Sequence, residues 1–288
     1  MPETPAEIWL KLECLQPIGS FKIRGAGNAL RSMPREALED GVYTASAGNM
    51  AQGVAWTARD MDVACSVVVP DNAPETKLRA IERLGARVVK LPFDAWWRVL
   101  VEHRLEGMAG AFVHPVSDRA VMAGNGTIAL EILEDLPDVE TILVPFGGGG
   151  LSCGIAAAAA ATAPAVRVLA CEVATAAPLA ASLAAGGPRA IEHTPSFVDG
   201  IGGKSLLEEM WPIASRLLGG SIVVSVADVA AAVRTLVERN RVVAEGAGAT
   251  SLAAALGGDA PGKKIVCVVS GGNIDAGKLG KILNGGVP

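Results

Sequence analysis

The chain has 288 residues, of which half are hydrophobic and 19% are charged, and its net charge is −5. This length allows a large core and two lobes. Binding to a nucleic-acid backbone needs concentrated Lys and Arg, and the sequence has no basic cluster, so we expect no nucleic-acid partner.

Expected strands and helices alternate along the whole sequence. An alternating strand near residue 10 opens the chain, and further strands are expected at 42–45, 63–69, 87–91, 111–114, 141–146, 166–173, 221–226 and 264–269. Helices are expected at 20–33, 74–84, 94–106, 211–218, 228–240 and 249–256, and others end near 61, 136 and 163. The stretch 174–205 is predicted to be irregular. This pattern predicts right-handed βαβ units in a parallel sheet.

The five cysteines are widely separated, and none forms a Cys-x-x-Cys pair, so we expect free thiols in a reducing compartment. The sequence does not begin with a basic and then apolar signal pattern. Its longest apolar run, 154–166, is shorter than the about 20 residues that span a bilayer. We therefore expect a cytoplasmic protein with no membrane association.

Lys22 stands in an unusual place for a lysine. Ser20 follows a Pro/Gly turn and is a good N-cap, so Lys22 would lie in the first turn of the next helix. The positive end of a helix dipole disfavours a cation and lowers the pKa of the amine. Such an amine is a nucleophile that can form a Schiff base with an aldehyde cofactor. A solvated surface lysine is the alternative.

The run Gly147–Gly150 follows an expected strand and precedes an expected helix. Without side chains, consecutive backbone N–H groups can converge on one anion, and the helix dipole adds to the attraction. The run lacks the Lys-Ser/Thr of a nucleotide P-loop and does not match Gly-x-Gly-x-x-Gly. It therefore indicates a site for a compact phosphate, with an ordinary glycine-rich turn as the alternative.

Polar residues also stand near other expected strand and helix ends, and open α/β sheets bind ligands beyond the carboxyl ends of their strands. Ser46–Asn49 offers donors for a carboxylate or, through Asn49, for a phenolic oxygen; a capping sequence is the alternative. Ser270 suits a hydrogen bond to a ring nitrogen, or an ordinary N-cap. Glu245 lies in an apolar Gly/Ala loop, where an unpaired charge is costly, so it is either salt-bridged or functional.

Four stretches resemble, in the same order, the fold-type II pyridoxal phosphate enzymes, and most closely their threonine/serine dehydratase (deaminase) branch. They are Ser20-Phe-Lys-Ile-Arg-Gly-Ala26, Ser46-Ala-Gly-Asn49, Gly147–Gly150 and Ser270-Gly-Gly-Asn273. The resemblance covers nearly the whole chain. It implies an α/β fold of two domains (tryptophan synthase β-like), with parallel-rich sheets flanked by helices.

The resemblance also implies roles for these residues. Lys22 would hold pyridoxal 5'-phosphate as a Schiff base and later move the substrate α-proton. The hydroxyl of Ser270 would face the ring nitrogen without enforcing a pyridinium, which favours prompt β-elimination. The implied activity is dehydration and deamination of L-threonine or L-serine to a 2-oxo acid and ammonia. The expected cofactor contacts are Phe21, Lys22, Asn49, Gly147, Gly148, Gly149, Gly150, Leu151, Glu245 and Ser270. The expected substrate contacts are Ser46, Ala47, Gly48, Asn49 and Met50.

The sequence departs from its relatives at several points. Met50 stands where His is common, which affects substrate preference. Ala47 stands where racemising relatives carry Ser, so the face opposite the lysine lacks a proton donor and racemisation should be weak. Glu172 aligns with one cation ligand of some relatives, but 174–178 offers no acidic partner, so we expect no metal. Only 21 residues precede Lys22, fewer than in relatives, so either the chain is a shortened form or part of the large domain's cover is missing.

The expected large cofactor-binding domain comprises 1–41 and 119–288, and the expected small mobile domain comprises 42–118. Closure of the small domain over substrate would exclude water. Relatives are commonly homodimers, so we expect a homodimer. Because the sequence shows no regulatory domain, we do not expect feedback control. Two alternatives remain open: a lyase for another β-substituted amino acid of the 3-hydroxyaspartate or phenylserine type, or a truncated, catalytically silent homologue that acts as a binding protein.

Overall fold

The computed structural model describes residues 6–288, which divide into two compact units. Unit 1 comprises the chain up to Ser20 together with Gly126–Pro288, and unit 2 comprises Phe21–Asn125. The predicted small domain, 42–118, lies within unit 2, which also includes the first helix and the beginning of the helix after residue 118.

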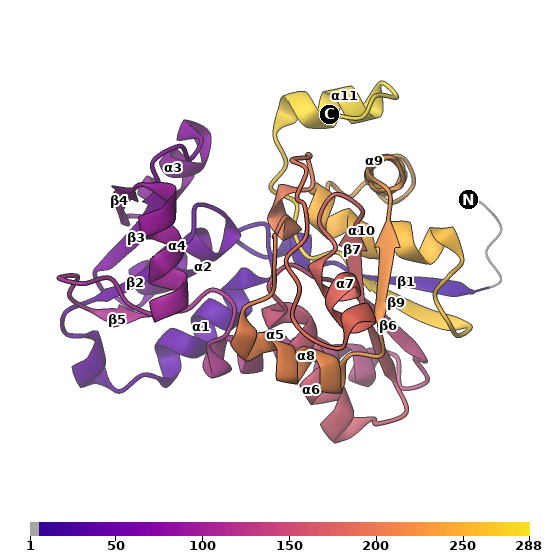
Figure 1. Cartoon of the computed structure of the whole chain (residues 1–288), viewed down its shortest axis with the longest axis horizontal. Helices are drawn as coiled ribbons and strands as arrows, with labels where there is room; N and C mark the ends of the chain where they lie inside the picture. The colour runs from indigo at the N-terminus through magenta and orange to yellow at the C-terminus, as the bar shows by residue number, and fades with distance from the viewer. Residues whose placement is uncertain (1–5) are drawn as a thin grey trace. The chain divides into compact units, whose positions relative to one another are not determined.

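Unit 1 is built on a five-stranded, wholly parallel sheet with the strand order β1-β9-β6-β7-β8 (Figure 1). Its strands are β1 (Glu7–Lys11), β6 (Thr141–Pro145), β7 (Arg167–Val173), β8 (Ser221–Val224) and β9 (Lys264–Val268). The central strand β6 is buried along its whole length. It therefore carries a continuous apolar run rather than an alternating one, as strands covered on both faces do.

The helices of unit 1 are α6 (Gly150–Thr162), α7 (Pro178–Ala185), α8 (Trp211–Leu217), α9 (Val226–Thr235), α10 (Gly246–Gly257) and α11 (Ala276–Leu283). Leu143 and Cys267 from the sheet share one core cluster with Val233 of α9 and Ala253 of α10. Both α6 and α10 are rich in alanine and glycine, and their small residues allow close packing on the strands.

Unit 2 has a smaller parallel sheet with the strand order β4-β3-β2-β5, drawn in indigo to magenta in Figure 1. Its strands are β2 (Val42–Ala45), β3 (Cys65–Pro70), β4 (Arg87–Leu91) and β5 (Ala111–Phe112). Its helices are α1 (Lys22–Ser32), α2 (Asn49–Asp60), α3 (Glu75–Glu82) and α4 (Phe93–Glu102). Val67 and Val69 pack with residues of α2 and α3, whereas Val68 packs with residues of α4, so helices cover both faces.

The predicted α/β class with parallel sheets flanked by helices is confirmed, but several elements differ from the prediction. Ser20 does not cap the first helix: α1 begins at Lys22 after Phe21, and Ser20 forms a bridge with Gly271 instead. A helix, α7, lies inside the stretch expected to be irregular. The helix expected to end near 136 is α5 (Arg119–Asp135), and Gly124 and Gly126 lie within it. The C-terminal helix α11 has no counterpart in the prediction.

All five cysteines are free, as expected. Burial raises the pKa of Cys153, in the first turn of α6, to about 12, so this thiol stays protonated at neutral pH. Across residues 6–288, no helix combines the length and apolar character needed to cross a bilayer.

Candidate active-site residues

Lys22 is the first residue of α1, in unit 2, and its side chain is partly buried. Its Nζ donates a hydrogen bond to the carbonyl oxygen of Pro115 over 2.8 Å and lies 5.2 Å from the centroid of the Phe21 ring. Burial lowers the pKa of the amine from 10.5 to about 8. A substantial neutral fraction is therefore present near pH 8, as a nucleophilic amine requires.

The cause of this pKa shift differs from the one that the sequence suggests. The prediction relied on the dipole at the start of α1, whereas removal of the ammonium from water is the dominant cause. The predicted position in the first helical turn is nevertheless where the structure places the residue.

Close helix packing holds the backbone of Lys22 in place. A Cβ atom at Gly53 of α2 would lie 3.0 Å from the carbonyl oxygen of Lys22, and one at Gly124 of α5 would lie 2.4 Å from that of Arg24. Larger residues at these glycines would push α1 away. The two glycines therefore fix the first turn of α1, and with it the origin of the lysine side chain.

The predicted substrate loop follows β2 and leads into α2, also in unit 2. The Ser46 hydroxyl accepts a hydrogen bond from the Gly48 N–H at 3.2 Å, and Asn49 is the first residue of α2. Ala47 packs against one core cluster, and the Met50 side chain is buried in another that includes residues of α1. The Met50 side chain is therefore engaged in the core, whereas the predicted substrate contacts of this loop stay a prediction.

The glycine run lies in unit 1, between β6 and α6. Gly149 has φ +96°, and a Cβ atom there would lie 3.1 Å from Phe146 Cε2 and 3.3 Å from Met210 Cε. A Cβ atom at Gly147 would lie 3.3 Å from the Cα atom of Ile201. Only glycine fits this turn, because a left-handed φ and close packing coincide. The turn leaves backbone at the positive end of a 13-residue helix, as an anion site needs.

Ser270 lies at the same sheet edge as the glycine run. The parallel strands β6 and β9 are hydrogen-bonded neighbours, and each ends just before one of the two segments. Ser270 is 3% exposed, and the next residues are fixed by backbone hydrogen bonds from Glu245 N to Gly271 O and from Gly272 N to Gly19 O. Ser270 and the glycine run therefore both follow the ends of neighbouring strands. Their roles toward the ring and the phosphate of one ligand stay a prediction.

Two further predicted cofactor contacts lie at helix starts in unit 1. Leu151 follows Gly150 in the first turn of α6 and is buried, so its backbone rather than its side chain is available to a ligand. Glu245 is the N-cap residue of α10, and its side chain makes no capping hydrogen bond. Its Oε1 would lie 3.4 Å from a Cβ atom at Gly200.

Glu172 has a structural use. Its fully buried carboxylate accepts hydrogen bonds from the N–H groups of Leu179 and Ala180, both at 2.8 Å, and from the Ser221 hydroxyl at 2.6 Å. It thereby caps the N-terminus of α7. Burial raises the pKa of this carboxyl, opposed by these hydrogen bonds. Both oxygens are engaged within the fold, so they do not suit a cation.

Comparison with known proteins identifies the family. Residues 2–271 match the family "Pyridoxal-phosphate dependent enzyme". The chain belongs to this family. An L-threonine ammonia-lyase of Thermotoga maritima is 41% identical over 288 residues, which cover 99% of this chain and 71% of the relative.

Solved structures of this pyridoxal-phosphate family agree. The processed form of threonine deaminase isoform 2 from Solanum lycopersicum superposes with a TM-score of 0.89 at 31% identity, covering 97% of this chain and 83% of the other. Maize serine racemase superposes with a TM-score of 0.87 at 34% identity, covering 97% of this chain and 87% of the racemase chain. These relatives confirm the predicted fold-type II class and its threonine/serine dehydratase branch, and pyridoxal phosphate as the cofactor.

The residues of each unit fit this cofactor chemically. Unit 1 offers the phosphate a glycine turn at a helix N-terminus, and unit 2 offers the aldehyde an amine whose pKa is about 8. One contact was not foreseen from the sequence, the Pro115 carbonyl that accepts from Lys22. A backbone carbonyl carries no residue-type signal, and the pair is 93 residues apart in the chain.

Proposed function

We propose that the protein is a pyridoxal phosphate-dependent ammonia-lyase that converts a hydroxy-amino acid such as L-threonine or L-serine to a 2-oxo acid and ammonia. The observation that carries the proposal is Lys22: a partly buried amine with a pKa of about 8, at the start of α1. Support for the substrate class comes from the relative named as an L-threonine ammonia-lyase, which matches 99% of this chain.

In the proposed site, Lys22 would hold the cofactor covalently and would then move the proton on the substrate Cα. When bound, pyridoxal phosphate supplies an electrophilic carbon and a conjugated ring that withdraws electrons. Gly147–Gly150 would bind the phosphate, Asn49 would donate to the ring hydroxyl, and the Ser270 hydroxyl would face the ring nitrogen. Ser46 and the backbone of 47–50 hold the substrate carboxylate. The family match supports one shared cofactor, because it spans residues 2–271 and so includes Lys22 and Asn49 as well as Gly147–Gly150 and Ser270.

The overall chemistry balances without an oxidant. Loss of the α-proton and the β-hydroxyl removes one water from the substrate, and the resulting enamine takes up one water to release ammonia. Threonine thus gives 2-oxobutanoate and serine gives pyruvate. The hydroxyl of Ser270 would not enforce a protonated ring, which would favour prompt β-elimination.

Racemisation is a second candidate, because maize serine racemase matches 97% of this chain. Racemisation needs a second acid on the face opposite Lys22. In this chain that position is Ala47, whose methyl group neither gives nor takes a proton. We therefore favour elimination, and we expect D-serine formation from L-serine to stay far below pyruvate formation.

We further propose that the enzyme works in the cytoplasm as a homodimer. Five free cysteines fit a reducing compartment. Analytical ultracentrifugation of the purified protein tests the dimer, and a single monomeric species would contradict it.

The activity test uses the purified protein loaded with pyridoxal phosphate and a panel of L-threonine, L-serine, 3-hydroxyaspartate and phenylserine. We expect ammonia and an equimolar 2-oxo acid from L-threonine or L-serine. Preference for 3-hydroxyaspartate or phenylserine would instead support a lyase of another β-substituted amino acid. Turnover of none of them, with the cofactor bound, would support a catalytically silent binding protein.

A further inference from the structure

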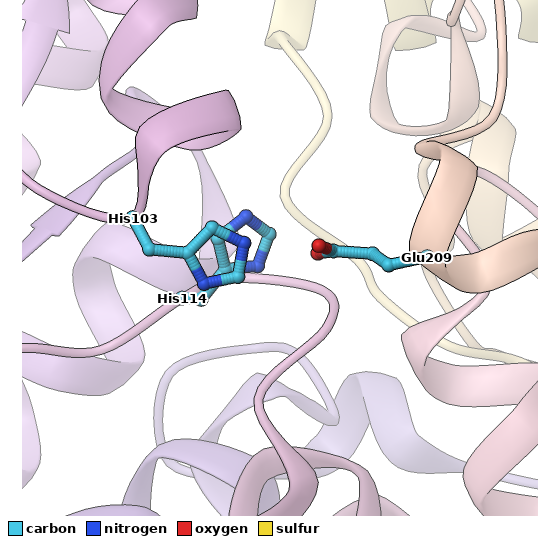
Figure 2. A group of neighbouring side chains, drawn as sticks. All are labelled: His103, His114 and Glu209. Carbon is cyan, nitrogen blue, oxygen red and sulfur yellow. The ribbon is translucent and has the colours of Figure 1, made fainter.

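His114 is a buried histidine of unit 2 that the proposed chemistry does not use. It follows β5, is 2% exposed, and stacks on His103 with 4.4 Å between ring centroids (Figure 2). His103 ends α4 with φ +56°. His114 immediately precedes Pro115, whose carbonyl oxygen accepts the Lys22 hydrogen bond.

The imidazole of His114 organises the turn that follows it. Its Nδ1 lies 3.1 Å from the N–H of Val116, 2.9 Å from the N–H of Ser117 and 2.9 Å from the Ser117 hydroxyl oxygen. Backbone N–H groups only donate, so Nδ1 must be the acceptor and the ring proton must lie on Nε2. Nε2 then donates to the carbonyl oxygen of Leu100 at 3.1 Å.

These bonds connect the turn to its surroundings at both ends. Leu100 lies in the last turn of α4, where carbonyl groups have no partner within the helix, so the Nε2–H satisfies one of them. On the N-terminal side of His114, the Thr44 hydroxyl donates a hydrogen bond to the carbonyl oxygen of Val113 at 2.8 Å. On the C-terminal side of the turn, the Asp118 carboxylate accepts hydrogen bonds from the N–H groups of Ala120 and Val121. The proline between these anchors has no N–H group and is itself buried.

We infer that His114 is a positioning residue for Lys22: its neutral imidazole, protonated at Nε2, fixes the 114–117 turn so that the Pro115 carbonyl holds the lysine amine. The carbonyl accepts from the ammonium form and so favours it, while burial favours the neutral form. The inference rests on the proposed role of Lys22 for its functional meaning. The contact itself is tested without the cofactor.

The first test uses the wild-type full chain. Two-bond ¹H–¹⁵N correlation spectra at pH 7.5 should show the proton of His114 on Nε2 and an unprotonated Nδ1. A proton on Nδ1 would overturn the inference, whatever any variant does.

The second test measures the apparent pKa of Lys22 in cofactor-free protein, from the pH dependence of its acetylation by acetic anhydride, followed by peptide mass spectrometry. His114→Leu replaces the imidazole with an apolar side chain of similar bulk, and it removes all of the ring's hydrogen bonds. We expect the apparent pKa of Lys22 to fall by about one unit, because the ammonium loses a charge-assisted bond. An unchanged or raised value contradicts the inference.

Two further variants separate positioning from general stability. His114→Asn places an amide oxygen near the position of Nδ1 and should restore the wild-type pKa of Lys22. Tyr43→Phe removes a hydrogen bond from the Leu105 N–H within the same unit, and should lower stability without changing that pKa. If Tyr43→Phe shifts it as much as His114→Leu does, His114 has only a structural role.

These outcomes are independent of the proposed function. If His114→Leu shifts the Lys22 pKa as expected but the wild-type protein never couples pyridoxal phosphate to Lys22, the positioning inference stands and the enzymatic proposal fails. If the cofactor couples to Lys22 but His114→Leu leaves the Lys22 pKa unchanged, the enzymatic proposal stands and the positioning inference fails.

Discussion

The two units present their candidate residues by different physical means. In unit 1 the glycine turn before α6 offers backbone groups whose position is set by φ angles and packing, and none of its residues titrates. In unit 2 the central group is a titratable amine whose pKa depends on burial and on one carbonyl partner. The first group should therefore respond to shape and be insensitive to pH, whereas the second should respond to charge.

The largest effect is expected from Lys22→Ala. It removes the only side chain to which we assign both cofactor attachment and proton transfer, so 2-oxo acid release from threonine should fall by about 10³-fold or more. Stability at neutral pH should not fall, which circular dichroism checks in parallel. Lys22→Arg is the matched control that keeps a charge: it should be as inactive, and an active Lys22→Arg enzyme would contradict the role.

Gly149→Ala tests the shape dependence of unit 1. A methyl group there combines a left-handed φ with contacts of 3.1 Å to Phe146 and 3.3 Å to Met210, so we expect a stability loss of about 2–4 kcal/mol. Gly85→Ala is the matched control, because Gly85 has a similar φ of +88° and no atom within 4 Å of the added methyl.

The control should lose only the strain of the left-handed residue, about 1–2 kcal/mol. Urea titrations measure both losses. Equal losses of stability in the two variants would show that the turn before α6 is not closely packed. That result would contradict its assignment as a rigid phosphate-binding turn.

The charge dependence of unit 2 is tested by Lys22→Met in cofactor-free protein. The folded pKa of about 8 lies below the value of 10.5 for an unfolded lysine, so the unfolded chain binds more protons between these pH values. Stability of the wild type should therefore rise with pH across this window.

Below pH 8 the full cost of burying the ammonium remains, and the variant should be more stable than the wild type by about 3 kcal/mol. The difference should disappear by about pH 11, where both states are neutral. Urea titrations at pH 7, 9 and 10.5 provide the measurement, and a difference that does not depend on pH would contradict the assigned shift.

A smaller effect is expected from Glu172→Gln, on strand β7 of unit 1. Glutamine has one acceptor oxygen, so one of the two N–H groups, of Leu179 or Ala180, would face an amide NH₂ and lose its acceptor. We expect a loss of about 1–3 kcal/mol and fraying of α7. Ser221→Ala, which removes a single bond to the same carboxylate, should lose less. Hydrogen exchange of 178–185 reports both changes, and an unchanged α7 would contradict the capping role.

The sequence predicts most of this architecture because its strands are short apolar runs closed by Gly, Pro or Asp. It fails where distant residues decide. The start of α7 depends on Glu172, six residues earlier and on β7, so the small-residue sequence near Pro178 suggests a loop when considered by itself. Gly124 lies inside α5 as a glycine because the backbone of Arg24 approaches within a distance that no side chain tolerates.

The candidate site shows the same division. Lys22, Gly147–Gly150 and Ser270 are marked by residue type and by position at the ends of strands or the starts of helices, which a sequence displays directly. The buried side chain of Met50 and the contact between Lys22 and Pro115 depend on tertiary packing, which local patterns do not contain. The role of His114 follows only from its hydrogen-bond geometry.

The most direct test of the account is borohydride reduction of the full chain incubated with pyridoxal phosphate at pH 8, followed by peptide mapping. We predict one phosphopyridoxyl group per chain, on Lys22, with loss of the modification in Lys22→Ala. Modification of another lysine, with Lys22 left free, would contradict the central assignment.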